Sequence, residues 1–206
     1  MMDDLFAQNP AVNLLPCDGV VNDFGRVLTH EAAEHFHQVL LRGLPWKNDE
    51  AVMFGKRIIT ARKVAWFGDG DFSYTYSGTT KQALPWTPEL RTLKAKAESL
   101  AGAVFNSCLL NLYHDGSEGM GWHSDDEKSL VADSAIASLS LGATRKFAFR
   151  HKEKDLGVSV MLESGSLLVM RGATQRHWLH SLPKMKRVTT PRINLTFRTM
   201  AGETIS

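Results

Sequence analysis

The sequence predicts an α+β fold, in which a β-sandwich or jelly roll packs against helices on one face. Two segments, at about 29–42 and 87–102, carry apolar residues at helical spacing. Short apolar or alternating segments follow them, separated by glycine or charged turns, as is typical of strands. Many short strands after a pair of helices indicate this fold class. The predicted strands are 104–113, 136–141, 146–150, 158–162, 167–170 and 192–197.

The N-terminal part is predicted to contain an arm and one helix. Residues 1–20 are predicted to form an irregular N-terminal arm. Thr29 is a favourable N-cap for the first helix, and Glu31 in the first turn suits the helix dipole. Gly43 and Pro45 are expected to end this helix.

The middle of the chain changes character. Residues 52–82 contain short aromatic segments broken by glycines, which predict strands and hairpins. The second helix is expected to begin after Thr87, a favoured N-cap, with Pro88 in the first helical position. Gly102 is expected to end it.

The composition is that of an ordinary globular protein. The chain has 206 residues, 43% of them hydrophobic and 22% charged, which predicts one domain with its own core. Two cysteines, Cys17 and Cys108, make no disulfide framework and favour a reducing compartment. The N-terminus is acidic where a secretory signal would be basic, and no apolar run approaches the ~20 residues of a membrane span. We therefore expect a soluble, cytoplasmic protein, with a monomer as the default.

The net charge of +2 is too small to indicate nucleic acid by itself. Basic residues nevertheless gather in two places. On charge alone, both groups are interpreted as solvated loops. The two groups are Lys184, Lys186 and Arg187, and Arg145, Lys146, Arg150, His151 and Lys152.

A His-x-Asp pair is the first feature that indicates chemistry. In an extended segment, residues two apart point to the same side, so His123 and Asp125 project into one space. One imidazole and one carboxylate make two thirds of the facial triad that binds non-haem iron(II). Because such pairs also occur by chance, the pair alone is weak evidence.

Two histidines follow, His177 and His180, and the second lies 57 residues after His123. Positions three apart in a strand face opposite ways, so at most one of them is expected to join the site. The other would be a core or surface histidine held by hydrogen bonds. The spacing alone does not choose between them.

The segment from Arg192 to Arg198 supplies a row of polar side chains. Alternation places Arg192, Asn194, Thr196 and Arg198 on one face of a strand. One interpretation is the solvent face of an edge strand. The other is the floor of a pocket for a dicarboxylate, because guanidinium groups form bidentate pairs with carboxylates. Asn111 and Tyr113 also share a face and can donate hydrogen bonds to the same ligand.

These motifs, in this order, resemble the AlkB-type iron(II)/2-oxoglutarate dioxygenases, which demethylate nucleic acids. The resemblance runs from about residue 52 to 201. Within the family, the sequence is most similar to the branch that repairs duplex DNA. Its main motifs are Asn111-Leu-Tyr-His-Asp-Gly116, His123-Ser-Asp125-Asp-Glu127, His177-Trp-Leu-His180-Ser-Leu-Pro183 and Arg192-Ile-Asn-Leu-Thr-Phe-Arg198. The branch is further matched by Phe54-Gly-Lys56, Tyr74-Thr-Tyr76-Ser-Gly78 and Phe149-Arg-His-Lys152.

The resemblance implies a double-stranded β-helix, another term for the jelly roll. It implies a single dioxygenase domain over residues 21–206, with nucleotide-recognition hairpins at about 50–85 and a jelly-roll core at about 104–200. It also implies iron(II), 2-oxoglutarate and O₂ as cofactors. The implied metal ligands are His123, Asp125 and His180, so the resemblance selects His180 over His177.

The resemblance also assigns binding residues. Arg192 and Arg198 would form salt bridges to 2-oxoglutarate, assisted by Asn111, Tyr113 and Asn194 and by Thr196 on the same face. Glu127 would contact the polar edge of the damaged base, and Tyr76 would stack on it, with Tyr74 nearby. Phe54 would fill the gap left by the flipped nucleotide. Phosphate contacts would come from the two basic groups, including Arg145, Lys184, Lys186 and Arg187.

The implied function is oxidative demethylation of N-alkylated bases such as 1-methyladenine and 3-methylcytosine in DNA. Two alternatives stay open: a dioxygenase of the same chemistry that acts on RNA, protein or a small molecule, and a nucleic-acid-binding module without catalysis. The sequence departs from the branch at two points. The loop after Lys152 is short, which weakens inferences about the opposite strand, and Tyr76 stands where the branch has Phe.

Overall fold

The computed structural model describes residues 9–53, 56–70, 73–76 and 79–201. These residues form three sheets, with strand orders β1-β11-β8-β13-β6-β3-β2 (the major sheet), β10-β9-β12-β7 (the minor sheet) and β4-β5. The helices are α1 (His30–Gly43), α2 (Pro88–Ala101) and α3 (Thr174–His177). The strands are β1 (Val20–Arg26), β2 (Lys47–Met53), β3 (Lys56–Gly68), β4 (Ser73–Tyr76), β5 (Thr79–Gln82), β6 (Ser107–Tyr113), β7 (Met120–His123), β8 (Ile136–Gly142), β9 (Arg145–His151), β10 (Gly157–Leu162), β11 (Ser166–Arg171), β12 (Trp178–Leu182) and β13 (Arg192–Arg198).

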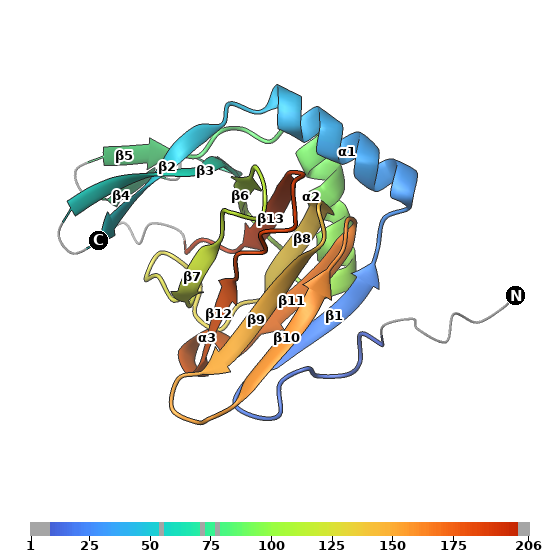
Figure 1. The fold of residues 1–206 in the computed structure, drawn as a ribbon, viewed down its shortest axis with the longest axis vertical. Coiled ribbons are helices and arrows are strands. Elements are labelled where there is room, and N and C mark those ends of the chain that lie inside the picture. Colours follow the sequence, from blue (N-terminus) through green and yellow to red (C-terminus); the bar gives the residue numbers. More distant parts are fainter. Residues whose placement is uncertain (1–8, 54–55, 71–72, 77–78, 202–206) are drawn as a thin grey trace, which may run out of the picture.

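The molecule is layered, and it has two cores. In the first, apolar residues of α1 and α2 such as Leu40 and Leu93 pack against major-sheet residues such as Leu139 and Leu195. The second core contains residues of both sheets, including Phe149. Figure 1 shows α1 and α2 along one side of the major sheet. The predicted jelly roll with helices on one face is therefore confirmed.

Both long helices begin and end where the sequence predicts. The hydroxyl of Thr29 accepts from the backbone N–H of Ala32 at 3.2 Å, and that of Thr87 accepts from Leu90 at 3.3 Å. These bonds satisfy backbone donors that a helix start leaves free. Gly102 adopts a left-handed φ of 60° after α2, a conformation that glycine adopts without strain.

The six predicted strands appear as β6, β8, β9, β10, β11 and β13, with ends that differ by at most three residues. The predicted hairpins at 52–82 are also present, but β3 is one long strand rather than a short aromatic segment. Figure 1 shows β2 to β5 projecting together at one side of the molecule. Three strands, β1, β7 and β12, are not predicted by the sequence, and β1 begins at the last residue of the predicted arm. In the described part of the chain, no helix combines the length and apolar character that a membrane crossing requires.

Candidate metal and 2-oxoglutarate site

The structure brings His123, Asp125 and His180 together. His123 ends β7 and lies directly opposite His180 on the antiparallel strand β12, and Asp125 follows two residues later. The two imidazole centroids lie 4.2 Å apart. The Oδ1 atom of Asp125 lies 3.8 Å from Nε2 of His123 and 3.9 Å from Nε2 of His180. One atom from each residue falls within 4.8 Å of the others, so the three residues can hold a metal ion.

The hydrogen bonds around these residues fix their orientation. Nδ1 of His123 lies 2.9 Å from the carbonyl oxygen of Gly121. Because a carbonyl only accepts, Nδ1 carries the proton and Nε2 keeps a lone pair for a metal. Gln175 accepts a hydrogen bond from the backbone N–H of Asp125 at 2.9 Å, and the ring of Phe147 stacks on His180.

The protonation states also suit a metal. Burial lowers the pKa of His180 to about 4, so its imidazole is neutral at neutral pH. Burial acts to raise the pKa of Asp125, but the positive charge of Arg198, together with the electrostatic interactions with His180 and His123, outweighs it, and the pKa lies below its usual value. Metal ligands must be deprotonated, and both groups meet that requirement.

His177 lies outside this cluster. It ends the short helix α3, and its ring stacks on His151 with centroids 6.2 Å apart. Residues 177–180 do not form one strand as the spacing rule assumes, because the strand begins only at Trp178. The choice that spacing left open therefore falls on His180.

Strand β13 is not an edge strand. It pairs with β6 on one side and β8 on the other, in the middle of the major sheet. Its four polar side chains line a cavity of about 1090 Å³, which also includes His123, Asp125 and His180. The solvent-face interpretation of this strand is thus wrong. A hydrogen-bonded row runs along it: Arg192 Nη2 donates to Asn194 Oδ1 at 3.0 Å, and Asn194 Nδ2 donates to Thr196 Oγ1 at 2.8 Å.

Arg192 presents a buried charge to this cavity. Its Nη2 donates to two neutral groups, the Ser140 hydroxyl at 2.9 Å and the Asn194 carbonyl, while Nε has no partner among the described residues. Burial, against an opposing effect of Tyr113 and with a smaller contribution from the neighbouring Arg145, lowers the pKa of Arg192 to about 10. A buried guanidinium that lacks a carboxylate is energetically unfavourable, so the site fits a ligand carboxylate, as 2-oxoglutarate would supply.

Arg198 lies nearer the metal ligands. Its Nη1 is 4.0 Å from Oδ2 of Asp125 and 3.5 Å from Oε1 of Glu127. Glu127 lines the same cavity, and its side chain is 44% exposed. Of the expected 2-oxoglutarate residues, Asn111 and Tyr113 on β6 complete the wall of this cavity.

One cavity residue, Arg62, was missed by the sequence analysis. Arg62 is buried on β3; its Nη1 donates to Asn111 Oδ1 at 3.0 Å, and its Nη2 is paired with Asp49. It thereby connects the β2–β3 hairpin to the predicted 2-oxoglutarate residues. No motif announces it, because a single arginine in an alternating segment usually faces solvent.

The expected base contacts are described only in part. Phe54 lies outside the described residues. Tyr74 and Tyr76 belong to β4, which pairs with β5 in a hairpin, and only their backbone is described. Glu127, as above, faces the cavity.

The expected phosphate contacts divide into two groups. Lys184, Lys186 and Arg187 are exposed in the loop between β12 and β13. Arg145 is not: its relative exposure is 0%, and its guanidinium donates to the carbonyl oxygens of Asp115, Glu118 and Pro183. The expectation of a phosphate contact is therefore wrong for Arg145, which instead holds together the loops beside the cavity.

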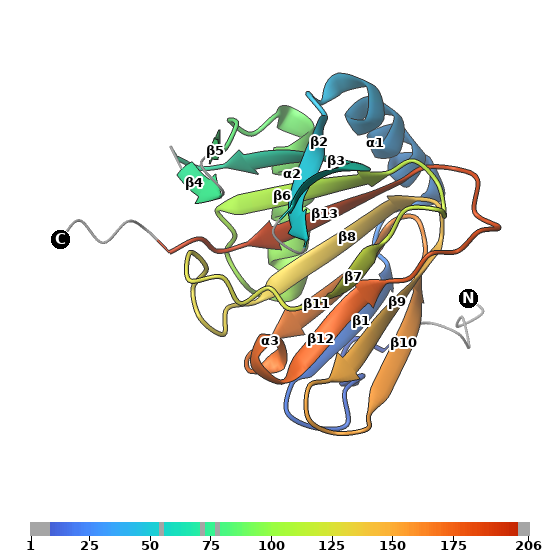
Figure 2. The ribbon, with the colours of Figure 1, turned by 60° about the vertical axis from the view of Figure 1, so that its left-hand side comes forward.

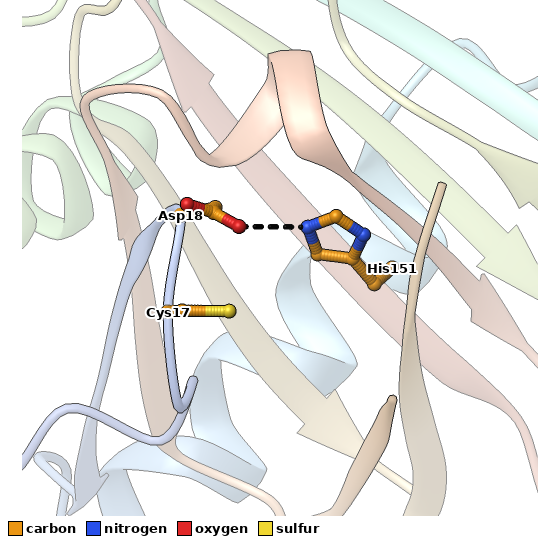
Figure 3. Close-up of side chains that lie close together, drawn as sticks. All are labelled: Cys17, Asp18 and His151. Carbon is orange, nitrogen blue, oxygen red and sulfur yellow. Dashed lines mark hydrogen bonds and ion pairs between the residues drawn. The ribbon is translucent and has the colours of Figure 1, made fainter. Parts of the chain in front are cut away.

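A second group of potential ligands, Cys17, Asp18 and His151, lies elsewhere (Figure 3). Nδ1 of His151 accepts from the backbone N–H groups of Glu153 and Lys154, so its Nε2 carries the proton and donates to Asp18 at 3.1 Å. The ammonium of Lys154 already pairs with Asp18 and lies 3.4 Å from the sulfur of Cys17. Both ring nitrogens of His151 are thus engaged, and the ammonium of Lys154 occupies the place that a metal ion would take. We therefore interpret these residues as a structural contact that holds the N-terminal segment against β9 and the turn after it.

The geometry defines a class of protein: a jelly roll with a His-Asp-His cluster and a buried arginine beside it is the arrangement of iron(II)/2-oxoglutarate oxygenases. Residues 23–198 match the 2OG-Fe(II) oxygenase superfamily. The chain belongs to the 2OG-Fe(II) oxygenase superfamily, and its cofactors are iron(II), 2-oxoglutarate and O₂.

Within this superfamily, the chain is similar to proteins of the AlkB type. The chain is 44% identical to the human DNA oxidative demethylase ALKBH2 over 154 residues, 71% of this chain and 59% of that protein. It is 42% identical to the human alpha-ketoglutarate-dependent dioxygenase alkB homolog 3 over 178 residues, 82% of this chain and 62% of that protein. The matches thus span less than two thirds of these relatives. The solved structure of OsALKBH1 shares the fold, with a TM-score of 0.60 at 18% identity over 90% of this chain and 99% of that one.

Proposed function

We propose that this chain demethylates N-alkylated bases in DNA, with 1-methyladenine and 3-methylcytosine as the first substrates to test. The observation that carries the proposal is the cavity. In it, His123, Asp125 and His180, which can hold a metal ion, lie beside Arg192, a buried arginine that has no carboxylate partner among the described residues. Similarity to the DNA oxidative demethylase ALKBH2 supports the choice of substrate.

The residues divide the work between them. His123, Asp125 and His180 would hold iron, and Arg192 and Arg198 would bind the carboxylates of 2-oxoglutarate, with Asn111, Tyr113, Asn194 and Thr196 as neutral partners. When bound, these cofactors supply the oxidising power that hydroxylates an N-methyl group, which then leaves as formaldehyde. The cavity of about 1090 Å³ is large enough for a small co-substrate and a further group.

The base would enter by leaving the duplex stack. This flipping costs a few kcal/mol, and the cost is smallest for a lesion that already blocks base pairing. We propose that Glu127 contacts the polar edge of the base and that Tyr76 stacks on the base, with Tyr74 nearby. Phe54 would fill the gap that the flipped nucleotide leaves. Lys184, Lys186 and Arg187, all exposed, would contact phosphates.

We also propose that the protein is an intracellular monomer. Its two cysteines, Cys17 and Cys108, are free thiols, as is usual in a reducing compartment.

Mass spectrometry of methylated oligonucleotides tests the proposal. Single-stranded DNA, duplex DNA and RNA, each with one methylated base, are incubated with the protein, iron(II) and 2-oxoglutarate. We expect the methyl group to be lost from DNA, and Asp125→Ala to abolish the loss while nucleic-acid binding persists. Turnover on RNA alone would favour the RNA alternative. Binding without turnover on any substrate would favour a non-catalytic module.

A further inference from the structure

The outer face of the minor sheet carries features that the proposed site does not use. Along β9, the side chains of Phe147 and Phe149 are buried, whereas those of Lys146 and Arg150 are exposed. On the flanking strands, Trp122 of β7 is 43% exposed and Met161 of β10 is 50% exposed. Figure 2 shows β7, β12, β9 and β10 side by side.

Trp122 and Arg150 form an exposed pair on this face. The guanidinium carbon of Arg150 lies 4.7 Å from the centroid of the Trp122 ring. Trp122 immediately precedes His123 on β7, so the two side chains point to opposite faces of the strand, and Trp122 is not among the residues that line the cavity.

The charge on this face has one sign. None of the four strands, all of whose residues the structure describes, contains Asp or Glu. The carboxylates nearest to these strands along the chain lie beyond the strand ends, and Asp126 among them lies 3.8 Å from Lys152. They are Glu118, Asp125, Asp126, Glu153, Asp155 and Glu163.

The face also continues into the exposed basic loop. The backbone N–H of Lys146 contacts the sulfur of Met185 at 3.2 Å, which places the loop that carries Lys184, Lys186 and Arg187 against this end of β9. Positive side chains therefore run from Arg150 past Lys146 to the loop. We refer to Trp122, Lys146 and Arg150 as the outer-face platform.

We propose that the outer-face platform binds the nucleic-acid strand next to the target nucleotide. A neighbouring base would stack on the free side of the Trp122 ring, and Arg150 and Lys146 would contact its phosphates. A positive surface with an exposed aromatic ring is the combination that single-stranded nucleic acid recognises, because every base has a flat face and every linkage a negative charge. This proposal rests on the proposed function and adds a second contact surface outside the cavity.

Fluorescence anisotropy tests the platform directly. A labelled, unmethylated single-stranded oligonucleotide is titrated with the full chain at several salt concentrations. We expect Trp122→Ala to weaken binding by about tenfold, and Arg150→Gln to lower the slope of log K against log salt by roughly 0.7. Arg91→Gln is the matched control, because it removes an equally exposed arginine from α2, which lies on the helical side of the major sheet.

Each outcome has a defined meaning. Variants are compared only if 2-oxoglutarate still raises their Tm as it does for the wild type, which shows an intact cavity. If Trp122→Ala and Arg150→Gln both bind like Arg91→Gln while the wild type demethylates DNA, the platform proposal is overturned and the proposed function stands. If the wild type binds the oligonucleotide through the platform but removes no methyl group, the proposed function fails instead. If Trp122→Ala binds the oligonucleotide as tightly as the wild type while Arg150→Gln weakens binding, the surface recognises charge alone, and base stacking is overturned.

Discussion

Replacing Arg192 with Met should raise the stability of the ligand-free protein while removing its affinity for 2-oxoglutarate. Arg192 is 2% exposed, and its only hydrogen-bond acceptors among the described residues are the neutral groups of Ser140 and Asn194. The folded protein therefore retains a desolvated charge until a carboxylate arrives. Met has a similar length, carries no charge and tolerates irregular space.

The magnitudes follow from these contacts. Burying an ion without a counter-ion destabilises a protein by several kcal/mol. Removing Arg192 also removes two hydrogen bonds from a charged donor, each worth about 1.5 kcal/mol. The balance favours the variant by about 1 kcal/mol, which corresponds to a rise in Tm of roughly 2–4 °C for a chain of this size. Loss of a bidentate carboxylate pair should weaken 2-oxoglutarate binding by about 3 kcal/mol, or roughly 100-fold in Kd.

Arg145→Met is the matched control. Arg145 is equally buried, but its guanidinium donates to three backbone carbonyl groups, those of Asp115, Glu118 and Pro183. Its loss would remove a charged donor from each of those carbonyl groups, at a cost on the order of 3 kcal/mol. We therefore expect the two buried arginines to give opposite changes in Tm without ligand.

Differential scanning fluorimetry with and without 2-oxoglutarate, and calorimetric titration of 2-oxoglutarate, measure both effects. The reasoning would be refuted by an Arg192→Met protein that is less stable than the wild type without ligand and binds 2-oxoglutarate with unchanged Kd. Such a result would mean that the guanidinium is compensated in the ligand-free protein and does not bind the co-substrate.

Three further predictions concern other parts of the structure. Asp125→Asn should abolish demethylation because a neutral amide is a poor metal ligand; formaldehyde release measures this, and full activity would remove Asp125 from the metal site. Arg62→Gln should weaken 2-oxoglutarate binding by about tenfold, since Asn111 would lose a charged donor; calorimetry checks it, and unchanged binding would make Arg62 purely structural. Asp18 has a pKa lowered to about 2, chiefly by its hydrogen bond to Lys154, so its stabilising contribution is full above its ordinary pKa of 3.8 and is lost as the pH falls towards 2. Asp18→Asn should therefore lower the urea midpoint at pH 7 but change it little near pH 2, and an equal change at both pH values would contradict the role of this carboxylate.

The sequence predicted the parts of the fold whose signals are local. Both long helices have hydroxyl caps, and Thr29 and Thr87 act as the pattern indicates. The apolar strands of the sheets were also found, because burial on one or both faces leaves a regular pattern. In contrast, β7 and β12 are short and carry the polar residues of the site, such as His123 and His180, so their composition resembles that of loops.

The residues of the site could be predicted from sequence motifs, but the burial of their side chains could not. Alternation correctly placed Arg192 and Arg198 on one strand face, but it could not show that this face lines a cavity in the middle of a sheet. Arg145 shows the limit most clearly. In a sequence, a basic residue beside other basic residues indicates a surface, and only the folded chain shows that Asp115 and Pro183 supply carbonyl partners for it.

The division of the cluster between the two sheets has a mechanical consequence. The end of β7 and the middle of β12, both in the minor sheet, supply His123 and His180, whereas Arg192 comes from the major sheet. Bound 2-oxoglutarate would thus connect the major and minor sheets, whereas iron would depend on the minor sheet and the segment that follows β7. We expect any motion that separates the two sheets to release 2-oxoglutarate before it disturbs the metal ligands. On warming, the protein would therefore lose 2-oxoglutarate first and iron only at a higher temperature.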